Sequence, residues 1–125
     1  TDVLLEIGSR LQQVLADALT QPANGHRELA RTAFKILAQE EFDPLFAVYF
    51  EVCGLAAAGV APYDDLAAPL TEGWVAWLAE FFTGTTKRRR AEAEASLALI
   101  DGMLLMRQLA GPAAADRAAK VLGVR

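Results

Sequence analysis

Residues 95–109, ASLALIDGMLLMRQL, decide the fold of this chain. At about 100° per residue, the apolar side chains of this segment form two faces of one helix. The broad face comprises Ala95, Ala98, Leu99, Gly102, Met103, Leu105, Met106 and Leu109, and the narrow face comprises Leu97, Ile100 and Leu104. A small domain can cover one face with its own core, so the other needs a different cover. We expect a second copy of the chain to cover it; the third and sixth helices predicted below are the alternative.

The rest of the sequence predicts an all-helical domain. Alanine occurs 25 times and leucine 18 times, and both residues favour helices. Alternating β-branched stretches of strand length are absent. Helical periodicity and local punctuation predict about six helices, over residues 2–20, 26–40, 43–59, 65–82, 86–110 and 113–122.

Two of these helices carry specific expectations. Asp43 and Pro44 form an N-cap followed by proline at the first helical position, and the helix that follows is apolar on every side except at Glu51. We therefore expect this third helix to be buried all round. Pro69 lacks a backbone N–H, so we expect it to delay the start of the fourth helix or to kink it.

Length and charge restrict the class of protein. The 125 residues fit one domain spanning 1–125, and the net charge of −4 argues against a surface that collects nucleic-acid phosphates. Cys53 is the single cysteine, which excludes an intramolecular disulfide. Without a signal-like N-terminus or a clean apolar run of about 20 residues, we expect a cytoplasmic protein with no membrane partner. Since the sequence opens at Thr1, we expect an N-terminal part of the natural protein to be missing.

Candidates for catalysis or metal binding have simpler interpretations. His26, at a helix start, is expected to be solvated or capping, and Cys53 to be a buried structural thiol. Glu51 is expected to form a salt bridge with Arg31 or Arg107, the alternative being contact with a ligand. The basic run 87–90 is expected to be a solvated helix end. The sequence thus predicts no metal site, no cofactor and no catalytic residue.

The order of elements, the segment 95–105 (ASLALIDGMLL) and the closing Gly111-Pro112 resemble the C-terminal half of a transcriptional regulator of the tetracycline-repressor type. The resemblance spans nearly the whole chain. It implies a ligand-sensing domain that forms homodimers through the two long late helices. It also implies that DNA is bound only through an N-terminal helix-turn-helix that is absent from this chain.

The resemblance further implies two sets of residues. The ligand set, which would hold an apolar or amphipathic small-molecule effector, comprises Phe46, Tyr49, Phe50, Cys53, Trp74, Met103 and Met106. The dimer set comprises Trp74, Trp77, Phe81, Leu97, Ile100, Asp101, Leu104 and Gln108. Trp74 belongs to both sets, and both assignments stay open. Two other functions remain as alternatives, a structural oligomerisation module without a ligand and a small helical enzyme.

Overall fold

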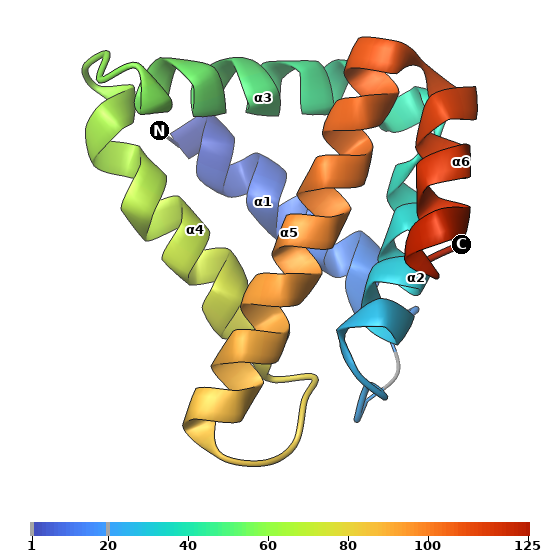
Figure 1. The fold of residues 1–125 in the computed structure, drawn as a ribbon. Helices are drawn as coiled ribbons and strands as arrows, with labels where there is room; N and C mark the ends of the chain where they lie inside the picture. Colours follow the sequence, from blue (N-terminus) through green and yellow to red (C-terminus); the bar gives the residue numbers. More distant parts are fainter. Residues whose placement is uncertain (1, 20) are drawn as a thin grey trace.

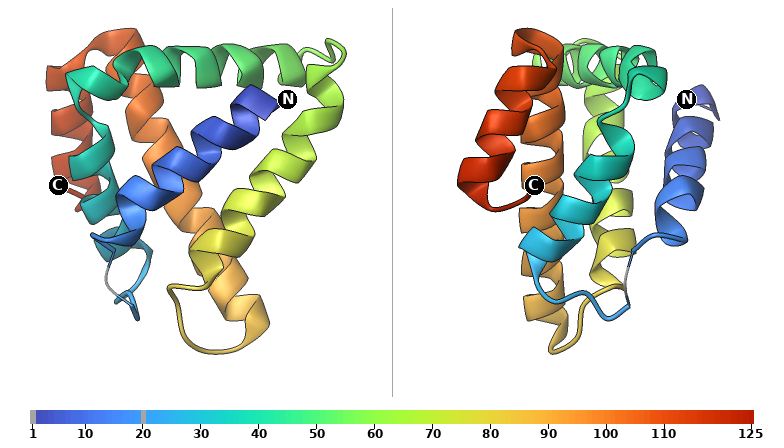
Figure 2. Two further views of the ribbon diagram at one scale, coloured as in Figure 1. Left: turned by 180° about the vertical axis from the view of Figure 1, so that it is seen from behind. Right: turned by 90° about the vertical axis from the view of Figure 1, so that its right-hand side faces the viewer.

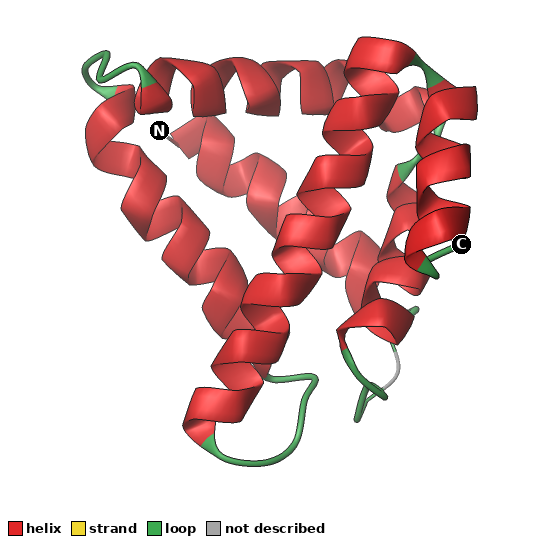
Figure 3. Cartoon of the chain, viewed as in Figure 1, coloured by secondary structure: helices red, strands yellow, loops and turns green. Residues whose placement is uncertain are grey.

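A computed structural model describes residues 2–19 and 21–125, and within them every regular element is a helix (Figures 1 and 3). The α-helices are α1 (Asp2–Ala16), α2 (His26–Leu37), α3 (Asp43–Ala57), α4 (Tyr63–Ala79), α5 (Thr86–Ala110) and α6 (Pro112–Leu122), with a short 3₁₀ helix, η1 (Glu40–Phe42), before α3. They form one unit. The predicted all-helical fold with six helices is confirmed.

The helix boundaries follow local signals closely. The side chain of Thr85 caps α5 by accepting a hydrogen bond from the backbone N–H of Arg88 at 3.1 Å. Gly111 ends the helix at a φ of 95°, a backbone conformation that favours glycine, and Pro112 begins α6. The predicted range 86–110 is therefore confirmed.

Other boundaries differ from the prediction by a few residues. The chain leaves α2 at Leu37 and forms η1, so the predicted helix over 26–40 ends early. Helix α4 starts at Tyr63, before Pro69, and the expected delayed start does not occur. Pro69 removes one backbone hydrogen bond inside α4 and its side chain is exposed, so it displaces no core residue.

Helix α5 lies at the centre of the fold and contacts α2, α3, α4 and α6. Helix α4 descends to the loop 80–85 and α5 returns beside it, with α6 and α2 packed against α5 and α3 crossing one end (Figure 1). Helix α1 lies on the opposite side of the molecule from α6, as a separate layer (Figure 2). One side of α1 therefore faces the other helices.

Polar contacts fasten the ends of α5 to the rest of the chain. Arg107 donates hydrogen bonds to both carboxylate oxygens of Asp43, at 2.8 and 3.1 Å, and the Gln108 side chain donates to the Asp43 carbonyl at 2.9 Å. Near the other end, Glu92 Oε2 lies 2.8 Å from both the backbone nitrogen and Nδ1 of His26. These contacts fix the starts of α3 and α2 against α5.

The prediction that the third helix is buried on all sides is wrong. Phe46 is the buried residue of α3, whereas Val48 is 46% exposed and Glu51 and Cys53 are also exposed. The reason is that α3 crosses the end of the molecule, where helices pack against only one of its sides. A helix with apolar residues on every side, such as α3, can therefore remain exposed on some of them.

Among residues 2–19 and 21–125, no helix is long and apolar enough to cross a membrane.

Candidate functional site

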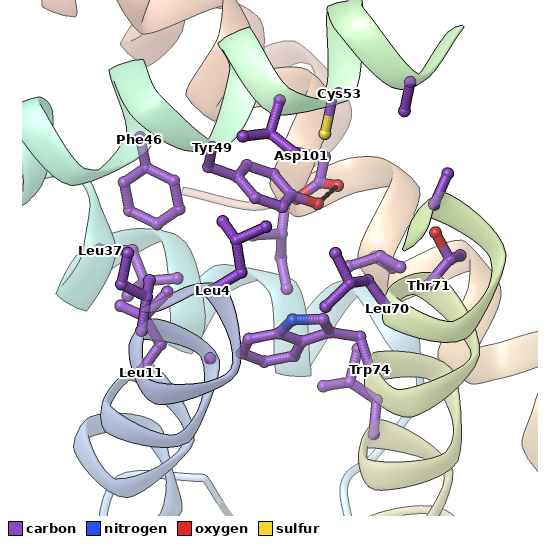
Figure 4. Close-up of a pocket in the computed structure, with 18 of the residues that line it drawn as sticks. Leu4, Leu11, Leu37, Phe46, Tyr49, Cys53, Leu70, Thr71, Trp74 and Asp101 are labelled. Atoms are coloured by element: carbon purple, nitrogen blue, oxygen red, sulfur yellow. Dashed lines mark hydrogen bonds between the residues drawn. The ribbon is translucent and has the colours of Figure 1, made fainter. Parts of the chain in front are cut away.

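A cavity of about 300 Å³ lies between α1, α3, α4 and α5 (Figure 4). Its walls are almost entirely apolar, and such a concave apolar space is typical of small-molecule sites. The lining residues are Leu4, Ile7, Gly8, Leu11, Leu15, Leu37, Phe46, Tyr49, Val52, Cys53, Ala56, Ala57, Tyr63, Ala67, Leu70, Thr71, Trp74, Leu78, Leu97, Ile100 and Asp101.

Small residues and large ones both line this space. Gly8 of α1 stands opposite the indole of Trp74, so that a Cβ at this glycine would lie 3.9 Å from Trp74 Nε1. Ala56 and Ala67 line the walls contributed by α3 and α4. Leu11 and Leu15 anchor the second half of α1 in the core, while Leu4 and Ile7 of its first half are only half-buried.

One pair of polar side chains interrupts the apolar wall. The hydroxyl of Tyr49, on α3, donates a hydrogen bond of 2.9 Å to Oδ2 of Asp101, on α5. Figure 4 shows this pair next to Cys53, with the ring of Trp74 on another wall of the cavity. The pair joins two helices and gives the cavity a single strongly polar spot.

The surroundings of this pair shift the pKa values of both groups. Burial raises the pKa of Asp101 to about 6, although the hydrogen bond from Tyr49 acts in the opposite direction. Burial, with the neighbouring Asp101 carboxylate, also raises the pKa of the Tyr49 phenol, so that it remains a hydrogen-bond donor. Burial raises the pKa of the Cys53 thiol as well, which makes it a poor nucleophile.

The structure brings together part of the predicted ligand set. Phe46, Tyr49, Cys53 and Trp74 line the cavity, whereas Phe50, Met103 and Met106 are not among its lining residues. Met103 is buried in another part of the core, and Met106 is 43% exposed. Neither projects from the side of α5 that carries Ile100 and Asp101.

Most residues of the predicted dimer set face inward within one chain. Ile100, Leu104 and Phe81 are each at most 8% exposed within one chain. Trp74 and Trp77 are half-buried and form an edge-to-face row with Phe81. Of the remaining members, Leu97 and Asp101 line the cavity and Gln108 bonds to Asp43. The narrow face of α5 therefore faces the core of its own chain.

Part of the broad face of α5 remains exposed. Leu105 is 38% and Leu109 78% exposed, and Ala98 and Gly102 are also exposed. With exposed Ala91, these residues define a line that we call the outer strip: Ala91, Ala98, Gly102, Leu105 and Leu109. Together with half-buried Ala95, the line is spaced by three and four residues alternately, the spacing of helices that pair with other helices.

The expected salt bridge of Glu51 does not form. Glu51 is exposed, and neither expected arginine pairs with it, since Arg107 binds Asp43 and Arg31 donates to the Gly123 carbonyl at 2.8 Å. The carboxylate held in apolar surroundings is Asp101, which had been assigned to the dimer set. Asp101 follows Ile100 and precedes Leu104, two residues of the narrow face. Because the narrow face is the buried one, this position could have indicated that Asp101 lies near the core.

The remaining candidates behave as local structure. His26 is half-buried and holds Glu92, and Cys53 is exposed rather than a buried structural thiol. Within the basic run, Lys87, Arg88 and Arg90 are exposed, and Arg90 pairs with Glu72. In the part of the chain that the structure describes, no group of three or more His, Cys, Asp or Glu residues could hold a metal ion.

Comparisons with protein-family models, with curated proteins and with solved structures found no match for this chain. The cavity and the exposed surface of α5 are therefore the features of the chain that bear on its function.

Proposed function

We propose that this chain is the small-molecule-sensing and dimerisation domain of a DNA-binding transcriptional regulator, a repressor of the tetracycline-repressor type that its sequence resembles. The cavity between α1, α3, α4 and α5 is the single observation that carries the proposal. Its volume of about 300 Å³ lies at the lower end of the range for small-molecule pockets.

The arrangement of the cavity suits a sensor. Its walls come mainly from α1, α3, α4 and α5, with Leu37 of α2, so a ligand would contact α1 and the α4–α5 pair at the same time. A ligand that prefers one arrangement of these helices shifts the population towards it. In such a regulator, DNA is bound by a separate helix-turn-helix, and a coupling of about 1–3 kcal/mol between the two sites changes the affinity for DNA by about 5 to 150 times.

A thermal-shift screen against hydrophobic compounds of one or two rings tests the proposal. A compound that binds the folded chain raises its melting temperature by mass action. In Ala56→Phe the new ring occupies the cavity, so we expect this variant to lose the shift. The matched control is Ala47→Phe, at an exposed position on the same helix, which should retain it.

Each variant is compared with its own melting temperature without compound, so a difference in stability between the two does not affect the result. Circular dichroism checks that both are folded. Absence of any stabilising compound, or an equal shift in both variants, would contradict a binding role for the cavity.

A second candidate function is a structural module for helix association without a ligand. The outer strip favours it, because apolar residues at this spacing lie exposed along α5. The two functions differ in the screen, since a purely structural module gains no stability from compounds that fit the cavity.

A further inference from the structure

The cavity wall contains one carboxyl group, that of Asp101, which no cationic side chain of the described residues pairs with. Asp101 accepts a hydrogen bond from Tyr49, which is a neutral donor. Among the described residues, the ion pairs within 4.0 Å are His26–Glu92, Arg90–Glu72, Arg90–Glu94 and Arg107–Asp43, and none includes Asp101. With a pKa of about 6, this carboxyl group is mostly ionised at neutral pH. A buried charge without a partner is costly, and a cation brought by a ligand would reduce that cost.

The other lining residues of the cavity indicate the chemistry of the part of the ligand that carries no charge. Leu70, Ile100 and Leu4 present aliphatic surface, and Trp74 and Phe46 present aromatic rings. A ligand that fits both the apolar walls and the carboxylate has a flat or compact apolar body with a polar group at one end. The net charge of −4 also favours the approach of cations over anions.

We propose that the cavity binds an apolar molecule that carries one protonated amine, with the amine held by the Asp101 carboxylate and the apolar body against Trp74 and the leucines. This proposal rests on the proposed sensing function and specifies its ligand class. Tyr49 is a positioning residue here, because its hydroxyl holds Oδ2 of Asp101 and leaves Oδ1 for the ligand.

Three probes of nearly the same shape test the role of charge. They are 2-(1-naphthyl)ethylamine, the neutral 2-(1-naphthyl)ethanol and the anionic 1-naphthylacetate, and their dissociation constants for the purified chain are measured by isothermal titration calorimetry. At about pH 7.5 we expect the amine to bind at least about tenfold more tightly than the alcohol, and the anion to bind more weakly than both.

Two variants assign any preference to a residue. Asp101→Asn keeps the shape and an acceptor for Tyr49 but removes the charge, so the amine should lose its advantage over the alcohol. Glu51→Gln removes the same charge from an exposed position on α3 and is the matched control, which should keep the advantage.

A measurement on the unmodified chain makes the test independent of the folding of these variants. The advantage of the amine over the alcohol should fall as the pH is lowered through about 6, because Asp101 becomes protonated while the amine stays charged. Among the described residues, the other titratable side chains on the cavity wall are Tyr49, Cys53 and Tyr63. Burial raises the pKa of Tyr49 and of Cys53, so both stay neutral over this range. On the outer side of Asp101, the groove between α4 and α5 contains Glu72, Arg90 and Glu94, which pair with one another.

The outcomes separate the ligand class from the sensing function. If the alcohol binds and the amine shows no advantage, or if Asp101→Asn keeps that advantage, the amine proposal is overturned and the sensing function stands. If none of the probes binds, the amine proposal is overturned together with the support for a small-molecule cavity.

Discussion

At the scale of a residue, Asp101 makes the stability of the folded chain depend on pH. Its pKa is about 6 in the folded chain, against an ordinary value of 3.8. The folded state therefore holds this proton more tightly than the unfolded state. The stabilisation from Asp101 is complete below about pH 4 and is lost as the pH rises through about 6.

Asp101→Asn should remove this dependence. At about pH 7.5 we expect the variant to be more stable than the wild-type chain by about 2–3 kcal/mol, because a buried charge has been replaced by a neutral group of the same shape. At about pH 4 the two should differ little, since Asp101 is then protonated. Urea denaturation at both pH values measures the difference. An equal difference at the two pH values would mean that Asp101 is not held in apolar surroundings.

At the scale of an element, α1 contains a glycine that the cavity does not sterically require. Gly8 lies in the middle of α1, where glycine lowers helix stability by about 0.5–1 kcal/mol relative to alanine. A Cβ at this position would be in ordinary contact with Trp74. We therefore expect Gly8→Ala to raise the free energy of unfolding by about 0.5–1 kcal/mol in chemical denaturation.

Gly84 provides the opposite case. Its φ is 109°, and an added Cβ would lie 3.3 Å from Cδ of Arg88. Gly84→Ala should lower the free energy of unfolding by about 1 kcal/mol or more, because an L residue is strained in this conformation. If Gly8→Ala destabilised the chain as much as Gly84→Ala, α1 would have to lie closer to α4 than the structure places it.

At the scale of the whole molecule, the outer strip is the surface that we expect to pair with a second copy. Leu105→Glu combined with Leu109→Glu places two charges on exposed positions, so the fold should persist while association is lost. Sedimentation at high micromolar concentration should show a dimer for the wild-type chain and a monomer for the double variant, with equal helicity by circular dichroism.

Leu5→Glu is the control for this experiment. Leu5 is 63% exposed, on α1, which lies on the other side of the molecule (Figure 2). This variant should remain a dimer. A wild-type chain that sediments as a monomer under the same conditions would remove the homodimer from the proposed function.

The candidate site was only partly predictable from the sequence. Phe46, Tyr49 and Trp74 were predicted to meet, and they do line one cavity. The methionines of α5 were assigned to it as well, because their residue type suits an irregular cavity, but their positions turn them away from it. Residue type suggested the chemistry of the site, and only the rotation of α5 decided which side chains reach it.

The sequence by itself determined the helices, because caps, prolines, glycines and apolar periodicity act within a few residues of the chain. Thr85 and Gly111 bound α5 by local hydrogen bonds and backbone conformation, whatever packs around it. It also determined that α5 carries two apolar faces.

Only the tertiary structure decided which of those faces turns inward. The choice depends on how α2, α3 and α4 pack against α5, and α2 and α3 are distant from it in sequence. That packing buries Ile100 and Leu104, places Asp101 at the cavity and leaves Leu109 exposed. Because burial of apolar surface is non-directional, the periodicity of one helix cannot specify its partners.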